Sequence, residues 1–169
     1  MGLSPSASEP VSSLEKARDA RPLRRSPYDR LVQLPDSARA IVESARLAHL
    51  VTLNRDGSPQ VSCVWVGLDC DEIVSGHLRD QQKLRNVRRD PRVSLSIEGT
   101  ERQPPGLLQY LVVHGRGRIT VGGAPELLQE LAYRYLGPGT RFPPMDEPPP
   151  GYVLRIEVER LGGVGPWAA

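Results

Sequence analysis

The 169-residue sequence predicts a mainly β protein of the α+β class, a closed or split β-barrel of about six antiparallel strands with short helices inserted between them. Three features of the chain support this fold class. Short apolar stretches recur, turn sequences such as Asp-Gly separate them, and each segment with helical periodicity is brief. The length corresponds to one domain with a tail.

The domain is expected to span residues 35–169. Residues 1–34 are rich in Ser, Pro, Ala, Glu and Arg and lack apolar periodicity, so we expect a disordered arm or one that contacts a partner. A helix should begin at Asp36 or Ser37, either of which can cap its first turn. One face of that helix would be apolar. Its side chains are Ala38, Ile41, Val42, Ala45 and Leu47.

Three strands are expected next, at residues 48–53, 59–66 and 72–78. The turn at 54–58 contains Asp-Gly, which supplies the positive φ that a tight hairpin needs. The turn at 69–71 leads into the third strand. Strands joined in sequence by such short turns predict an antiparallel meander.

The middle strand has alternating faces, because successive side chains of a strand point to opposite sides. The two sets are Val61, Cys63 and Trp65 on one face and Gln60, Ser62 and Val64 on the other. We interpret Cys63 as a small apolar filler within this strand. With Cys70 as the second cysteine, the chain has too few for a disulfide framework or a zinc site, which fits a reducing cytoplasm.

The second half of the chain alternates short helices with longer strands. A helix at 80–89 should end at Pro91, because the residue before a proline avoids the α region. The remaining elements are strands at 92–98, 107–121 and 152–159 and a helix at 124–136. A rigid loop rich in proline and glycine is expected at 137–150. Gly115 and Gly117 resemble a nucleic-acid RG repeat, but a close backbone approach within a strand explains them better.

The overall charge argues against general nucleic-acid binding, and the hydropathy argues against a membrane span. Lys and Arg number 22 against 20 for Asp and Glu, so the chain lacks the strongly basic balance of a general nucleic-acid binder. No run approaches the roughly 18 apolar residues of a membrane span. The three histidines, His49, His77 and His114, show no metal-ligand spacing. Because the overall charge is nearly balanced, any anion site must be formed by a local group of cations.

The helix at 80–89 is the candidate anion site. On a helix, Lys83 and Asn86 lie together beside the apolar stripe, near a first turn whose backbone N–H groups are free. An ammonium beside an amide is a reasonable phosphate cradle, whereas Arg85 and Arg89 should point into solvent. Only two of the 22 cations are lysine, and this rarity strengthens Lys83 as a candidate anion-binding residue. An ordinary basic surface helix is the alternative interpretation.

Three strings carry a resemblance to a known family. They are K-x-x-N-x-x-R-D-P-R-V-S-L at 83–95, D-G-S-P-Q-V-S-x-V-W at 56–65 and G-V-G-P-W at 163–167. From about residue 37 to the C-terminus the chain resembles the pyridoxamine 5′-phosphate oxidase-like superfamily. Within it, the chain is most similar to the F420-dependent oxidoreductases of the flavin/deazaflavin group.

The resemblance implies a split β-barrel homodimer with cofactor clefts at the subunit interface. Lys83 and Asn86 would hold the cofactor phosphate or anionic tail. Trp65 would wall the cleft or pack in the core. The other expected cofactor-binding residues are Gln60, Ser62 and Val64 under the ring and Gly76 and His77 along the cleft.

The implied activity is hydride transfer from reduced F420 to a small unsaturated substrate, with no catalytic side chain and no metal. Three alternatives stay open: an FMN- or FAD-dependent oxidase, a non-catalytic flavin, F420 or haem carrier, and a small nucleic-acid-binding barrel. Haem is the least favoured ligand. Arg160-Leu161 is followed by Gly162-Gly163 instead of completing the R-L-x-P motif of pyridoxamine phosphate oxidases, so vitamin B6 activity is not expected.

Overall fold

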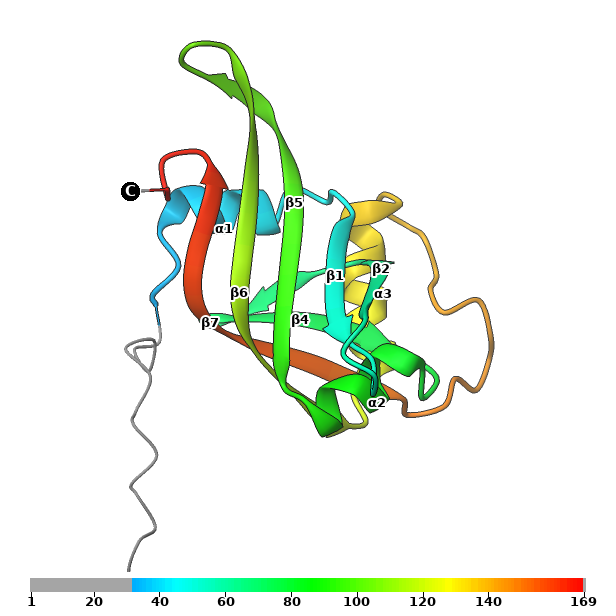
Figure 1. Ribbon diagram of the computed structural model, residues 1–169. Helices are drawn as coiled ribbons and strands as arrows, with labels where there is room; N and C mark the ends of the chain where they lie inside the picture. The colour runs from blue at the N-terminus through cyan, green and yellow to red at the C-terminus, as the bar shows by residue number, and fades with distance from the viewer. Residues whose placement is uncertain (1–31, 169) are drawn as a thin grey trace, which may run out of the picture.

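The computed structural model describes residues 32–168, and within them the chain forms one sheet of seven antiparallel strands with three short helices (Figure 1). The predicted fold class, mainly antiparallel β with short helices, is confirmed. The predicted arm at 1–34 lies almost wholly outside the described residues. Of its last three residues, Leu34 is buried in the core and Val32 N donates to Val158 O at 3.0 Å.

The elements have the following bounds. The strands are β1 (Ala48–Leu53), β2 (Pro59–Val64), β3 (Gly67–Asp69), β4 (Glu72–His77), β5 (Arg92–Gln103), β6 (Leu107–Val121) and β7 (Tyr152–Val164). The helices are α1 (Asp36–Val42), α2 (Gln82–Arg89) and α3 (Ala124–Tyr135). None of the described helices is long and apolar enough to cross a membrane.

The order of strands in the sheet is β2-β1-β5-β6-β7-β4-β3, which corrects the predicted meander. β2 pairs with β1, but β4 pairs with β7 and with the short β3 instead of with β2. β2 and β3 are therefore the two edges of an open sheet. β3 was not predicted, because its three residues follow the apolar stretch of β2 without a turn sequence between them. β5 and β7 also extend beyond their predicted ends, and the β5–β6 hairpin rises above the rest of the fold (Figure 1).

The first helix is shorter than predicted. α1 buries Ala38, Ile41 and Val42 against the sheet, as the apolar pattern indicates. The helix then ends, because Ala45 adopts a left-handed φ of 58° and Leu47 is half exposed. The predicted side-chain cap was wrong: Pro35 occupies the capping position and no side chain caps the helix.

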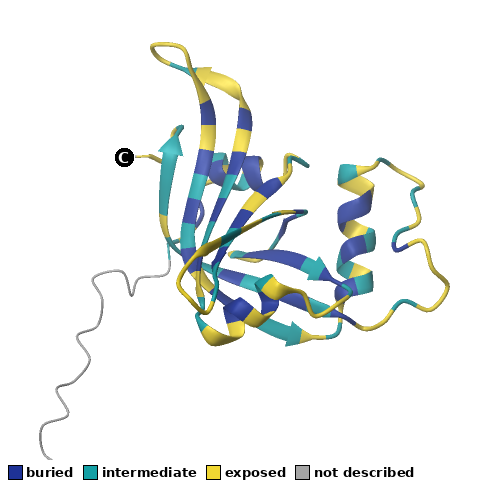
Figure 2. Cartoon of the chain, turned by 45° about the vertical axis from the view of Figure 1, so that its right-hand side comes forward, coloured by how far each residue is buried: buried dark blue, intermediate teal, exposed yellow. Residues whose placement is uncertain are grey.

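Close backbone approach explains Gly115 of β6, whereas Gly117 leaves room for the side chains of Val87 and Leu154. A Cβ at Gly115 would lie 2.1 Å from the carbonyl oxygen of Glu157 on β7. At this point His114 pairs with Arg160 and Gly115 with Val158, so Glu159 is an extra, bulged residue. The bulge bends the long β6–β7 pair, and burial alternates along these strands from one face to the other (Figure 2).

We predict that Gly115→Ala lowers the free energy of unfolding by about 3 kcal/mol or more, because the methyl group overlaps a backbone oxygen that cannot rotate away. Chemical denaturation measures this. Gly162→Ala on β7 is the matched control, since a Cβ there meets nothing within 4 Å. Equal stability of the two variants would contradict the close approach.

Candidate functional site

A pocket of about 250 Å³ lies where β2 and β4 meet the start of α2, with α3 and the 137–150 loop on its other side. Five of the eight residues predicted for the cofactor line it. These are Val64, Trp65, Gly76, His77 and Lys83. The remaining lining residues are Leu47, Cys63, Ser75, Gln81, Leu128 and Phe142. Residues as far apart in sequence as Leu47 and Phe142 thus line one pocket.

Three predicted residues do not line the pocket. Ser62 is half-buried within β2 opposite Leu50 of β1. Gln60 and Asn86 bond to each other beside the pocket, with the Asn86 Nδ2 donating to the Gln60 Oε1 at 3.2 Å. If these three residues contact a cofactor as predicted, the cofactor must extend beyond the pocket.

The side chain of Asn86 is fully buried and fully hydrogen-bonded. Its Nδ2 also donates to the Thr52 Oγ1 at 3.1 Å and the Asn54 Oδ1 at 3.0 Å. Its Oδ1 accepts from the Gln82 Nε2 at 2.9 Å and the Arg89 Nη2 at 3.2 Å. This amide fastens α2 to the β1–β2 hairpin and so fixes the helix that carries the pocket's cation.

Arg89 belongs to the same attachment. Its guanidinium also bonds to the carbonyl of Leu53, at the end of β1. Arg89 is exposed, as predicted, but these hydrogen bonds were not predicted from the sequence. Arg85 is exposed, as predicted, and bonds to the carbonyl of Asp80 at 2.5 Å within its own segment.

Lys83 supplies the only charge in the pocket lining. The side chain is half-buried and forms no ion pair with any described residue. Burial lowers the pKa of Lys83, and the nearby thiol of Cys63 acts in the opposite direction. A cation without a counter-ion in a partly desolvated wall favours an anionic ligand.

His77 faces the same pocket as a neutral imidazole. Its side chain is only 6% exposed, and its Nε2 is buried with no hydrogen-bond partner among the described residues. Burial and, second, the positive charge of Lys83 lower the pKa of His77 to about 4. A buried polar atom without a partner is costly, so this nitrogen fits a site that receives a polar ligand group.

An aromatic wall closes the pocket on the α3 side. Trp65 stacks on Tyr135 with ring centroids 5.1 Å apart and meets Phe142 at 5.0 Å. Tyr135 in turn donates from its hydroxyl to the Arg46 carbonyl at 3.0 Å and accepts from the Val66 N–H at 3.0 Å. Trp65 is half-buried, and its ring lines the pocket while it contacts Tyr135 and Phe142.

The 137–150 loop contributes Phe142 to this wall, and Gln129 of α3 holds it there. The Gln129 Nε2 donates to the Thr140 carbonyl at 2.8 Å, and its Oε1 accepts from the Phe142 N–H at 3.0 Å. Gly76 permits α3 to approach β4, since a Cβ there would lie 2.9 Å from the Leu128 Cγ. Neither Gln129 nor Phe142 carries a sequence signal that could have identified it.

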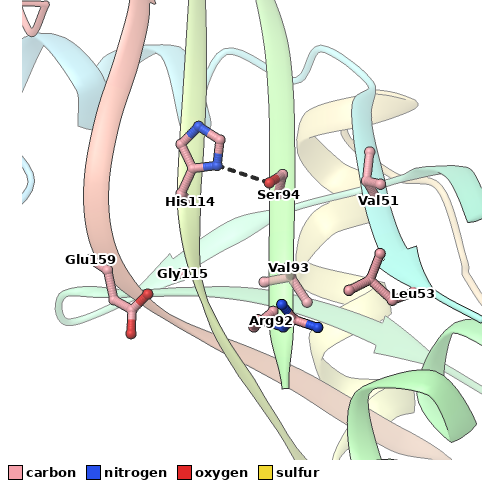
Figure 3. Close-up of a pocket in the computed structure, with 8 residues that line it drawn as sticks. All are labelled: Val51, Leu53, Arg92, Val93, Ser94, His114, Gly115 and Glu159. Carbon is pink, nitrogen blue, oxygen red and sulfur yellow. Dashed lines mark hydrogen bonds between the residues drawn. The ribbon is translucent and has the colours of Figure 1, made fainter. Parts of the chain in front are cut away.

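A second pocket, of about 300 Å³, lies over β1, β5 and β6 (Figure 3). Ser94 Oγ and His114 Nδ1 are 2.9 Å apart across the two strands, and burial lowers the pKa of His114. Arg92 at its rim is already paired with Asp90 at 2.6 Å. None of the predicted cofactor residues lines this pocket. No group of three or more metal-ligating side chains exists within residues 32–168.

Solved structures share this fold. An F420 reductase has a TM-score of 0.60 and 25% identity, covering 76% of this chain and 98% of its own. A conserved hypothetical protein from Mycobacterium tuberculosis has a TM-score of 0.57 and 25% identity, covering 78% and 88%. An FAD-binding protein from Mesorhizobium loti has a TM-score of 0.52 and 20% identity, covering 73% and 88%. The chain therefore shares its fold with an F420 reductase and with an FAD-binding protein.

A family model described as pyridoxamine 5′-phosphate oxidase matches residues 34–165. The chain belongs to this family. No curated protein sequence is significantly similar to it.

We predict that Asn86→Ala lowers the free energy of unfolding by about 2–4 kcal/mol, because Thr52 and Gln60 lose a buried donor. Gln82→Ala is the control: it removes one bond to the same amide from an exposed position and should cost under about 1 kcal/mol. Denaturant titration separates the two. A smaller loss in Asn86→Ala than in Gln82→Ala would show that the amide does not fasten α2.

A second prediction concerns acid stability. The unfolded chain protonates His77 near pH 6.5, whereas the folded protein resists protonation down to about pH 4. Between these values the unfolded state binds more protons, so stability falls as the pH drops, by at most about 3 kcal/mol. His77→Gln should flatten this part of the stability–pH curve.

His49→Gln, which removes an exposed imidazole, is the control and should retain the slope. Urea unfolding at a series of pH values gives both curves. Identical slopes in the two variants would mean that His77 does not titrate as its burial indicates.

Proposed function

We propose that the protein is an oxidoreductase that uses reduced F420 to transfer hydride to a small unsaturated substrate. The main support is the pocket beside α2, in which Lys83 is the only charged lining residue. The similarity to an F420 reductase over 76% of the chain supports the choice of cofactor. When bound, the reduced deazaflavin would supply the hydride, and the chain would bind and orient it.

The proposed roles follow from the pocket's chemistry. Lys83 would hold the phosphate or acidic tail, as a compact point charge suited to phosphate. His77, neutral at pH 7, would give its unpartnered Nε2 to a polar group of the ligand. Val64 and the ring of Trp65 offer apolar surface, while Asn86, Gln60 and Ser62 act beside the pocket.

We propose that a second copy of the chain completes the site. A volume of about 250 Å³ is at or below the lower end of the range for pockets that enclose a whole small-molecule ligand. A cofactor with a ring and a charged tail would extend outside it, towards the β2 edge of the sheet. A homodimer would cover the part that one chain leaves open, in a cytoplasmic protein with no role in nucleic-acid binding.

An FMN- or FAD-dependent oxidase is the second candidate, because the fold also matches an FAD-binding protein. Lys83 does not discriminate among these cofactors, since each carries phosphate. A non-catalytic carrier of a flavin, F420 or haem would use the same pocket without turnover.

In an oxidoreductase, the substrate would enter beside Phe142, on the wall that the 137–150 loop forms.

Binding spectra test the proposal directly. Purified protein is incubated in parallel with F420, FMN, FAD and haem, and the ligand retained after gel filtration is measured by absorbance. We expect retention of F420 and substrate-dependent oxidation of its reduced form. Retention of FMN or FAD alone would favour the second candidate, and retention without turnover on a panel of activated alkenes would favour a carrier.

We predict that Lys83→Gln weakens binding of the retained cofactor by about 10- to 100-fold, the value of a hydrogen bond to a charged group. Arg85→Gln is the control, because it removes the same charge from the same helix at a residue that does not line the pocket. Fluorescence titration gives both dissociation constants. Equal weakening in the two variants would mean that only general charge matters.

A further inference from the structure

The sequence context predicted that Cys63 is a small apolar filler within the sheet. This prediction was wrong, because the residue is exposed. The residue is exposed on the edge strand β2 and lines the pocket beside Lys83 and His77. Burial lowers the pKa of Lys83 and Cys63 acts to raise it, and the two residues line the same pocket. The unpartnered and buried His77 Nε2 independently marks this pocket as one that takes a ligand.

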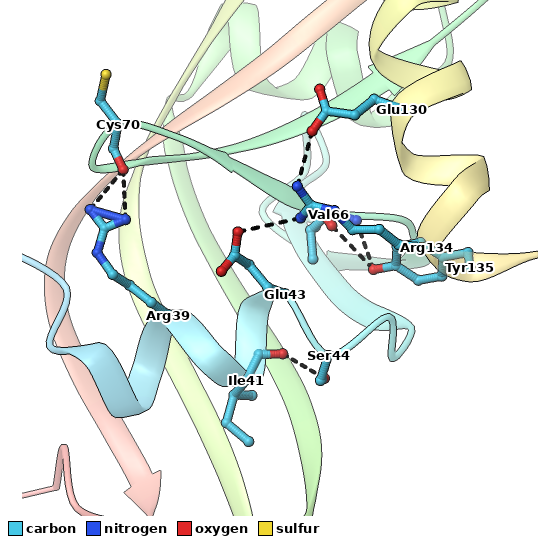
Figure 4. A network of polar contacts seen from close by, with 9 residues as sticks. All are labelled: Arg39, Ile41, Glu43, Ser44, Val66, Cys70, Glu130, Arg134 and Tyr135. Carbon is cyan, nitrogen blue, oxygen red and sulfur yellow. Dashed lines mark hydrogen bonds and ion pairs between the residues drawn. The ribbon is translucent and has the colours of Figure 1, made fainter. Parts of the chain in front are cut away.

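The other cysteine has different surroundings. Cys70 is exposed in the β3–β4 turn, between Asp69 and Asp71. Arg39 bonds to the Cys70 carbonyl at 2.8 and 2.9 Å and pairs with Asp71, and Asp69 pairs with Arg155 at 2.6 Å. The charges there are compensated, and the sulfur points away from the Arg39 guanidinium (Figure 4). At Cys63, by contrast, the cation has no acidic partner among the described residues.

We propose that Cys63 is a reactive modification site for anionic disulfides of low molecular weight, and that its adduct occupies the pocket. An uncompensated ammonium in a concave wall attracts an anionic reagent and raises its local concentration. Reactive cysteines typically lie in partly exposed, electropositive surroundings of this kind. An adduct in the pocket would also exclude the cofactor, and this consequence rests on the proposed function.

The chemistry is one thiol–disulfide exchange. The Cys63 thiolate attacks one sulfur of the reagent disulfide, a bond forms between the two sulfurs, and the other half leaves as a thiolate with the electron pair of the broken bond. The Cys63 sulfur is oxidised from the thiolate to the disulfide level, and the departing sulfur is reduced from the disulfide to the thiolate level, so the electrons balance. The proton of the thiol goes to water. A reducing thiol reverses the step and clears the pocket.

Single-cysteine variants test this. The reagent is 5,5′-dithiobis(2-nitrobenzoate), a dianionic disulfide, and release of thionitrobenzoate gives the rate. Cys70→Ser, which keeps Cys63, should react at least about tenfold faster than Cys63→Ser, which keeps Cys70. The uncharged reagent 4,4′-dithiodipyridine should narrow this ratio several-fold, since only the anionic reagent is attracted by the ammonium. Equal rates with the anionic reagent would overturn the proposal.

A second experiment tests whether Lys83 attracts the reagent. In the Cys70→Ser background, Lys83→Gln should slow the reaction of Cys63 with the dianionic reagent several-fold, whereas Arg85→Gln should leave it unchanged. Raised salt should slow only the protein that retains Lys83. An unchanged rate in Lys83→Gln would overturn the assignment of the thiol to this cation.

Protection by a cofactor separates this proposal from the proposed function. Saturating F420 should slow the modification of Cys63 at least about tenfold and leave Cys70 unaffected. A Cys63 that reacts fast and stays unprotected by F420 would overturn the placement of the cofactor in this pocket, and would leave the reactive thiol standing.

Discussion

The buried amide of Asn86 is the interaction on which the position of the candidate site depends. α2 is a short helix with no side-chain cap, so its own hydrogen bonds do not fix its place on the sheet. Leu84 and Val87 bury its apolar side, but apolar contact is not directional. The Asn86 bonds to Thr52 and Gln60 supply the direction, and Lys83, one turn earlier, takes its orientation from them.

The charge of Lys83 affects the protonation of His77 in the same pocket. Burial and, second, the ammonium of Lys83 lower the pKa of His77 to about 4, so the imidazole stays neutral at pH 7. A neutral imidazole can donate or accept at the Nε2, whereas an imidazolium would only donate and would add a second buried charge. The wall therefore combines one fixed positive charge with one uncharged hydrogen-bonding nitrogen, a pairing that suits a ligand with both an anionic group and a polar ring.

The sequence was sufficient for what local pattern determines and insufficient for sheet order. Alternation in β2 correctly separated Gln60, Ser62 and Val64 from Val61 and Cys63, but the exposed set includes a pocket residue because β2 is an edge strand. The partners of Asn86 lie 26 to 34 positions earlier in the chain, so no helix-based pattern could show that its amide is already satisfied. Phe142 reaches the pocket only because a loop without periodicity is held by Gln129.

Arginine and lysine differ in their contacts in this structure. Every ion pair within residues 32–168 uses an arginine, and most join separate segments, such as Arg134 with Glu43 and Arg118 with Glu72 (Figure 4 shows the first). The planar guanidinium, with its fixed donors, suits such pairs. Lys83 makes none. A compact ammonium without a carboxylate partner keeps its charge available to a ligand, and an arginine at this position would extend a larger group into a pocket of about 250 Å³. The one lysine within residues 32–168 thus lines the pocket with its charge unpaired.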